Sequence, residues 1–184
     1  IYAPALVKLV HVFGVSASSI KSSISVYLLG YGVTQVVWGP LSDRFGRKNI
    51  SLIGLYLLIM SSVMVLFRIK ISTFLLLRFL QGVGIAAANT ANRAMLVDSF
   101  SGADFKKYMT FTTISWSVSP IAAPVLGAYL ITFLGWKSCF MLLSCYTAIM
   151  IIWLQFFIKS SKPSIPDLTI NKFTSYLKTI FSSK

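Results

Sequence analysis

Long apolar runs alternate with short polar segments along the whole chain. A bilayer core about 30 Å thick requires about 20 apolar residues in a helix that crosses it. The pattern therefore predicts membrane-spanning helices at about 19–38, 50–67, 73–97, 108–133 and 138–158. Residues 1–7 are expected to end an earlier helix, and residues 8–18 to form a loop outside the membrane. The predicted fold class is all-α and integral to the membrane, with residues 1–158 as one helical bundle.

Residues 39–50 form the most charged of the short segments. Gly39 and Pro40 are expected to end one helix, and Gly46 to supply a positive φ for a turn. Asp43 would then lie near the start of the next helix, where the helix dipole favours a carboxylate. The cations of this segment are Arg44, Arg47 and Lys48. The alternative is a solvated basic loop that serves membrane topology alone.

The tail at 159–184 begins with Pro163 and Pro166 and then becomes amphipathic. Its apolar side chains recur at helical spacing between Phe173 and Phe181, with lysines around them. This pattern predicts a cytoplasmic segment containing a short helix on the inner leaflet. A flexible linker is the alternative.

Composition supports the assignment to a membrane. The chain of 184 residues is 56% hydrophobic and 11% charged, whereas soluble domains have about 25% charged residues. Its formal net charge of +13 does not indicate nucleic-acid binding, because the cations lie in short segments between apolar runs rather than on one soluble surface. One His and four acidic residues offer no acid–base pair and no metal-ligand spacing, so the sequence predicts neither an enzyme nor a metal site.

The positive-inside rule places the segment at 39–50 on the cytoplasmic side, together with most of the other extramembrane Lys and Arg residues. Arg68 and Lys70 are exceptions, because they fall on the outer side. Residue 1 would also lie at the outer face. A complete protein is therefore expected to have one more helix before it, and the chain to be truncated at its start.

Polar residues share one face of the helix expected at 73–97. At about 100° per residue, Arg78, Gln81 and Asn89 align with Ile85, Asn92 and Arg93. An arginine at this depth needs water, a partner or a path to the headgroups. We expect an aqueous cavity on this face, with Tyr27 and Gln35 on its other wall; an Arg78 that extends to the outer headgroups is the alternative.

Small and helix-distorting residues mark two further features. Gly82-x-x-x-Ala86 and Gly84-x-x-x-Ala88 permit close helix packing in a membrane. Pro120 and Pro124, four apart, each remove a backbone donor and are expected to bend the helix at 108–133. The bend could serve a moving element or be static.

Three of these segments together resemble the motifs of a transporter family. Gly39-x-Leu41-x-Asp43-Arg44-x-Gly46-Arg47-Lys48 resembles the loop between the second and third helices of the major facilitator superfamily. Arg78-x-x-Gln81-Gly82-x-Gly84 resembles its fourth-helix motif. Pro120-x-x-Ala123-Pro124-x-x-Gly127 resembles the antiporter motif of its fifth helix, in the form of the bicyclomycin-resistance drug-efflux family, with Ala128 in place of a second glycine.

This resemblance implies the N-terminal six-helix half of a twelve-helix drug exporter, with most of the first helix missing. Arg47 would pair with Asp98, Asp43 would cap a helix of the other half, and Arg78 would take part in proton coupling. The implied partners are the lipid bilayer, protons, a small apolar or cationic drug-like substrate and the missing C-terminal half. No cofactor is implied, because a proton gradient would drive transport across the bacterial inner membrane. The alternative is a non-transporting remnant, or a half that needs a separately encoded second half.

Overall fold

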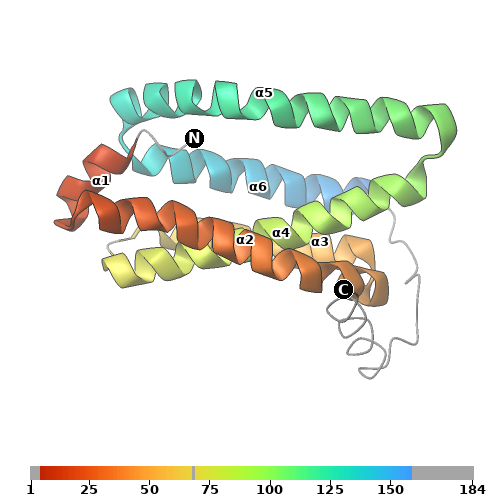
Figure 1. The fold of residues 1–184 in the computed structure, drawn as a ribbon, viewed down its shortest axis with the longest axis horizontal. Coiled ribbons are helices and arrows are strands. Elements are labelled where there is room, and N and C mark those ends of the chain that lie inside the picture. The colour runs from red at the N-terminus through yellow and green to blue at the C-terminus, as the bar shows by residue number, and fades with distance from the viewer. Residues whose placement is uncertain (1–4, 68, 159–184) are drawn as a thin grey trace, which may run out of the picture.

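The computed structural model describes residues 5–67 and 69–158, and throughout this part the regular elements are helices. In chain order they are α1 (Leu6–Phe13), α2 (Ala17–Phe45), α3 (Arg47–Met64), α4 (Ile71–Ser99), α5 (Gly102–Leu134) and α6 (Lys137–Phe157). The long helices run roughly along one axis (Figure 1). The predicted amphipathic helix in 159–184 lies outside the described residues.

Two predicted boundaries are wrong. The predicted outer loop at 8–18 is largely helical, because α1 continues to Phe13 and ends at Gly14 with φ 61°. Gly39 and Pro40 do not end a helix, because α2 continues through both to Phe45. A proline inside a membrane helix is tolerated where other groups satisfy the freed carbonyl. The connection between α2 and α3 is therefore Gly46 alone, not a charged turn.

Three of the helices are long and apolar enough to cross a membrane by length and composition: α4, α5 and α6. The helix α2 has 29 residues and would span about 43 Å at 1.5 Å per residue. It therefore has the length of a spanning helix, with more polar residues than the three above.

The helix α4 is central and packs closely against α2 on one side and α3 on the other. A Cβ on Gly84 would lie 2.6 Å from the Gly54 carbonyl oxygen of α3. A Cβ on Gly82 would collide with the Tyr27 carbonyl oxygen of α2. The predicted close packing at both glycines is thus present, and each glycine serves a different neighbour. Such contacts matter because hydrophobicity does not drive helices together within lipid.

An aromatic cluster joins the helices at the end where α1 lies. The rings of Phe13 and Phe74 are 5.2 Å apart, and Phe74 meets Phe140 edge-on at 6.2 Å. Trp136 contacts Phe13 and Phe140 at 6.4 and 6.1 Å. This cluster fixes the ends of α1, α4 and α6 against one another.

The helix α5 lies apart from the closely packed helices α2, α3 and α4 (Figure 1). Within it only Gly127 and Ile131 are buried. It contacts α6 more than α4, and much of its apolar surface is exposed. The helix α5 is therefore packed only loosely against the rest of the bundle.

Candidate functional site

The inner end of the bundle is built around the single-residue turn at Gly46. Gly46 has φ 90°, a conformation that favours glycine. The Asn49 side chain donates to the Phe45 carbonyl at 3.0 Å and so caps the end of α2. Asp43, in the last turn of α2, and Arg47, the first residue of α3, therefore lie close together on either side of this tight turn.

Arg47, the first residue of α3, contacts both neighbouring helices. Its Nη1 donates to the Ala94 carbonyl and forms an ion pair with Asp98 of α4. Its Nη2 lies 3.4 Å from the carboxylate of Asp43. The Arg47 side chain is 14% exposed, against 36% for Asp43 and 42% for Asp98. A shielded guanidinium thus bridges two half-exposed carboxylates, and the pairing with Asp98 is the one that the motif resemblance implies.

All three charges oppose the dipole of their own helix. Asp43 lies in the last turn of α2, not near the start of the next helix as expected, and Asp98 lies in the last turn of α4. Arg47 begins α3. Carboxylates are disfavoured at helix C-termini and cations at N-termini, each by about 0.3–1 kcal/mol at a surface. The three charges are therefore favourable mainly through one another, and separating them would expose three unfavourable placements at once.

The next two basic residues of the segment act differently. Lys48 donates to the Gln155 and Ile158 carbonyls at 3.0 and 2.5 Å, at the C-terminal end of α6, where a cation is favourable. Arg44 is exposed and lies over the Phe45 ring at 5.2 Å. Gly39 lies within α2, with open space beside it. Arg47 and Lys48 therefore tie α3 to α4 and α6, while Arg44 and Gly39 make no such connection.

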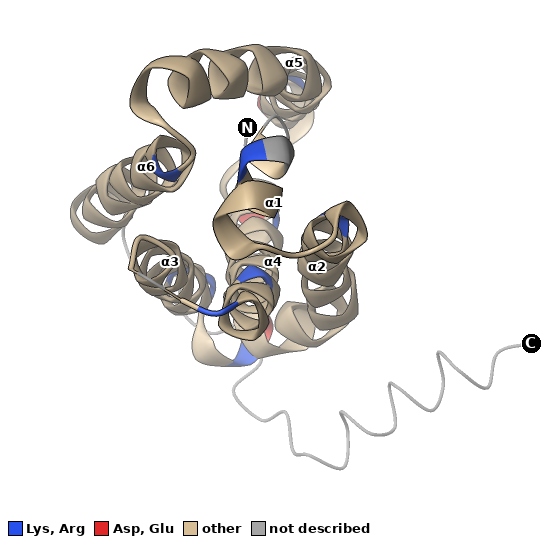
Figure 2. Cartoon of the chain, turned by 90° about the vertical axis from the view of Figure 1, so that its left-hand side faces the viewer, with Lys and Arg blue, Asp and Glu red and all other residues tan. Residues whose placement is uncertain are grey.

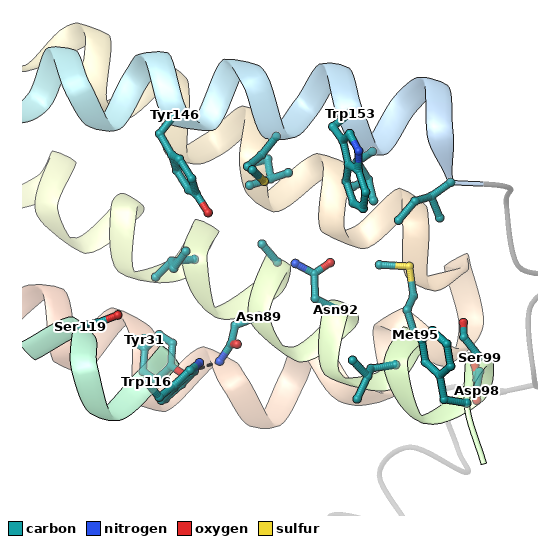
Figure 3. Close-up of a pocket in the computed structure, with 18 of the residues that line it drawn as sticks. Tyr31, Asn89, Asn92, Met95, Asp98, Ser99, Trp116, Ser119, Tyr146 and Trp153 are labelled. Carbon is teal, nitrogen blue, oxygen red and sulfur yellow. Dashed lines mark hydrogen bonds between the residues drawn. The ribbon is translucent and has the colours of Figure 1, made fainter. Parts of the chain in front are cut away.

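A cavity of about 950 Å³ lies between α2, α4, α5 and α6 and reaches the inner end (Figure 3). Aromatic side chains supply much of its wall, and Tyr146 and Trp153 of α6 face across it towards α4. Among the described residues that line it, Asp98 is the one ionisable acid or base other than tyrosine. The aromatic lining residues are Tyr27, Tyr31, Phe100, Trp116, Tyr146 and Trp153.

The polar face of α4 is divided between this cavity and the packed interior. Asn89 and Asn92 line the cavity: Asn89 donates to the Tyr31 hydroxyl at 2.7 Å, and Asn92 accepts from Ser51 at 2.9 Å. Arg78 and Gln81, further along, are buried and do not line it. The expectation of one continuous aqueous face is therefore wrong for the half of the face that contains Arg78.

Arg78 is held by rings and by a short hydrogen-bond chain. It donates to Gln81 at 2.7 Å, Gln81 donates to Ser62 at 3.0 Å, and Ser62 donates to the Leu58 carbonyl. The guanidinium lies 4.9 Å from the Tyr27 ring and 5.8 Å from the Phe140 ring. Cation–π contacts of this kind compensate in part for lost hydration. At 7% exposure, Arg78 does not extend to the headgroups, and this alternative is also wrong.

The prediction for the other wall of the cavity is correct for one of its two residues. Tyr27 lines the cavity and also contacts Arg78, so it lies between the two. Gln35, also expected on this wall, is half-buried and does not line the cavity. Tyr31, not selected from the sequence, takes its place. Its spacing of four from Tyr27 was the available signal, because residues i and i+4 share a helix face.

The helix α5 contributes its proline motif to the opposite wall. It is one continuous helix through both prolines, and Trp116, Ser119 and Pro120 line the cavity. Because proline has no backbone N–H, Pro120 cannot donate to the Trp116 carbonyl. Pro124 is exposed, and Gly127 is buried. The motif thus leaves the carbonyl of Trp116, a lining residue, without a hydrogen bond from position 120.

Comparison with known proteins decides the family. The model of the Major Facilitator Superfamily matches residues 1–184. The chain belongs to the major facilitator superfamily. It is 32% identical, over 98% of its length and 44% of the relative's, to chloramphenicol resistance protein CraA of Acinetobacter baumannii. It is 26% identical to multidrug resistance protein D of Escherichia coli, over 100% of the chain and 46% of the relative.

A bicyclomycin resistance protein homolog of Haemophilus influenzae is 29% identical over 78% of the chain and 36% of the relative. The chain therefore spans less than half the length of these curated relatives. Membership of this family, together with the apolar helices, makes the chain a multi-pass membrane protein of a transporter superfamily rather than of an enzyme family.

Proposed function

We propose that this chain forms the N-terminal half of a proton-coupled exporter of small drug-like molecules in a bacterial inner membrane. One observation carries the proposal: Asp98 lines the large cavity and also forms the ion pair with Arg47. A cation or a proton that reaches Asp98 from the cavity competes with Arg47 for the same carboxylate. Occupancy of the cavity is thereby linked to the contact that ties α3 to α4.

The chemistry of the cavity supports the substrate class. Its wall is mainly apolar and aromatic, and its charged lining residue is an acid. Aromatic faces and a carboxylate both attract cations, while apolar drugs gain from burial of their surface. Small apolar or cationic molecules therefore fit better than anions. The relatives named for resistance to chloramphenicol, to bicyclomycin or to several drugs agree with this class.

Proton coupling would involve Arg78 and the buried hydrogen-bond chain that it begins. Arg78 lies deep between Tyr27 and Phe140, and Tyr27 separates it from the cavity. Movement of Tyr27 during transport would change the surroundings of the guanidinium. Arg78 would thereby respond to events in the cavity without contacting the substrate.

A second six-helix half would complete the transporter. The exposed apolar residues along α5 and around the cavity provide surface for such a partner. Transport sites of this kind form between two repeats. The described helices alone leave the cavity open, which keeps the alternative of an inactive chain or a separately encoded second half.

The test is drug accumulation in bacterial cells that lack their own efflux pumps. The chain is expressed alone and together with the C-terminal half of a relative, and accumulation of chloramphenicol and of a lipophilic cationic dye is measured. We expect reduced accumulation only when both halves are present. Collapse of the proton gradient should raise accumulation again to the level of cells without the transporter. Unchanged accumulation with two inserted halves would overturn the exporter proposal, and activity that survives the collapse would overturn proton coupling.

A further inference from the structure

A second cavity lies at the end of the bundle opposite to Asp98. It has a volume of about 590 Å³ and lies where the ends of α1, α3, α4 and α6 meet. Its described lining residues are Val12, Phe13, Phe67, Ile69, Lys70, Trp136 and Lys137. The proposed exporter mechanism uses none of them.

Two cations face this cavity without a nearby acid, at the end of the bundle that faces the viewer in Figure 2. Within the described residues the acids are Asp43, Asp98 and Asp104, and all three belong to the inner ends of α2, α4 and α5. Lys70 is exposed, and its ammonium makes no hydrogen bond or ion pair with the described part of the chain. Positive charge at this end is unexpected, because the positive-inside rule favours Lys and Arg on the other side.

Lys137 is held in place by the protein and still has donors to offer. Its ammonium donates to the Leu66 carbonyl at 2.7 Å and lies 5.7 Å from the Trp136 ring. An ammonium has three N–H donors, and the Leu66 carbonyl accepts one. Lys137 and Lys70 both line the cavity, so the remaining donors of Lys137 and those of Lys70 are available to one ligand in it.

Two helices begin at the same cavity. Lys70 is the N-cap of α4, and Trp136 is the N-cap of α6. Neither helix has a side-chain cap or an acidic residue in its first turn. The first N–H groups of a helix lack partners within it, and the dipole adds positive potential there. These two helix ends therefore add to the potential of the two lysines.

The rim of the cavity is apolar. Phe67 is 67% exposed and Val12 is 55% exposed, and both line the cavity. Trp136 lies beside them, as expected of a side chain at a membrane–water interface. An anion that binds among the lysines would thus have hydrocarbon surface next to it, which suits the headgroup and upper acyl chains of a lipid.

We propose that this cavity binds the phosphodiester headgroup of an anionic phospholipid in the outer leaflet, with Lys70 and Lys137 as its cationic contacts. Basic pockets between membrane helices suit anionic headgroups. Phosphate is the shared chemistry of a lipid headgroup and free inorganic phosphate, and the exposed apolar rim favours the lipid. The assignment depends on the helical bundle and its membrane location, not on drug transport.

Native mass spectrometry of the full chain, purified in a neutral detergent, tests this site. The probes are phosphatidylglycerol, zwitterionic phosphatidylcholine and inorganic phosphate. We expect phosphatidylglycerol to bind more tightly than phosphatidylcholine, and each of Lys70→Gln and Lys137→Gln to weaken its binding about five-fold. The matched control is Lys21→Gln, which removes an exposed lysine near the start of α2, outside the cavity.

The outcomes separate the possibilities. Equal loss of binding in the Lys21 variant would show diffuse charge attraction and overturn the site, as would equal binding of the two lipids. Displacement of phosphatidylglycerol by millimolar inorganic phosphate would overturn the lipid assignment in favour of a free anion. If Lys137→Gln disturbs folding, Lys70→Gln decides alone, because the Lys70 ammonium makes no hydrogen bond to the described residues that the change would remove, and Lys137→Arg should restore binding.

Discussion

Arg47 at the start of α3 forms an ion pair with Asp98 in the last turn of α4, and Asp98 also lines the large cavity. The pair therefore connects the wall of the candidate transport cavity to the turn between α2 and α3. Both charges are placed against the dipole of their own helix, so each depends on the other.

Weakening this pair should affect transport more than insertion. In a complete transporter, Arg47→Lys should lower efflux at least about tenfold, because a single ammonium cannot reproduce a planar guanidinium that reaches Asp98, Ala94 and Asp43 together. A lost charge-assisted hydrogen bond is worth about 1.5–3 kcal/mol. Efflux is measured alongside the amount of inserted protein, and normal efflux in the variant would contradict the role of the pair.

The two acids around Arg47 should contribute differently to the stability of the folded chain. Asp98 is the closer partner, and Asp43 is 3.4 Å away. Asp98→Asn should lower the melting temperature in detergent by about 2–4 °C, the equivalent of about 1 kcal/mol in a chain of this size, and Asp43→Asn by less. Equal shifts would show that the two acids are equivalent partners, and a larger shift for Asp43→Asn would show that Asp43 is the main partner; either result would contradict the prediction.

A separate efflux assay of Asp43→Asn in the complete transporter tests its proposed contact with the other half, and we expect efflux to be lost while insertion is kept.

The sequence predicted the helices and the Arg47–Asp98 pair, because both depend on local pattern and on motif resemblance. It placed the end of α2 too early, because Gly39 and Pro40 are ordinary signals for a helix end. Here α2 continues, and the chain turns at Gly46 with Asn49 capping the Phe45 carbonyl. Helical periodicity also put Arg78 on the cavity face. Its actual position depends on Phe140 of α6, a contact distant in sequence that no local pattern encodes.

Arg78 should be required for the proton dependence of transport. Arg78→Ala would remove the cation between Tyr27 and Phe140 and leave Gln81 without its donor. We expect efflux in the complete transporter to lose its response to external pH. The control is Arg93→Ala on the same helix, because Arg93 is exposed and lies over the Trp116 ring at 5.2 Å. An unchanged pH response in Arg78→Ala would exclude the coupling role.

Glycine packing should be specific to position. Gly84→Ala places a Cβ 2.6 Å from the Gly54 carbonyl oxygen and 3.0 Å from the Leu58 nitrogen, so α3 and α4 must separate, at about 1–3 kcal/mol. Gly32→Ala is the matched control, because nothing lies within 4 Å of its Cβ and alanine is the better helix former. Thermal unfolding in detergent should show a lower melting temperature for Gly84→Ala and an equal or higher one for Gly32→Ala. Equal decreases would contradict the close contact between α3 and α4.

Lys48 should control the inner end of α6. Its ammonium caps the Gln155 and Ile158 carbonyls, while Arg47 beside it holds α4, so adjacent residues tie two helix ends to one turn. Lys48→Met keeps much of the apolar stem and removes the charge and donors. We expect faster hydrogen exchange in the last turn of α6, with unchanged exchange near Phe74 at the far end of the bundle. Lys106→Met, an exposed change on α5, should leave α6 unaffected, and equal acceleration in both variants would show that the capping contacts do not stabilise this end.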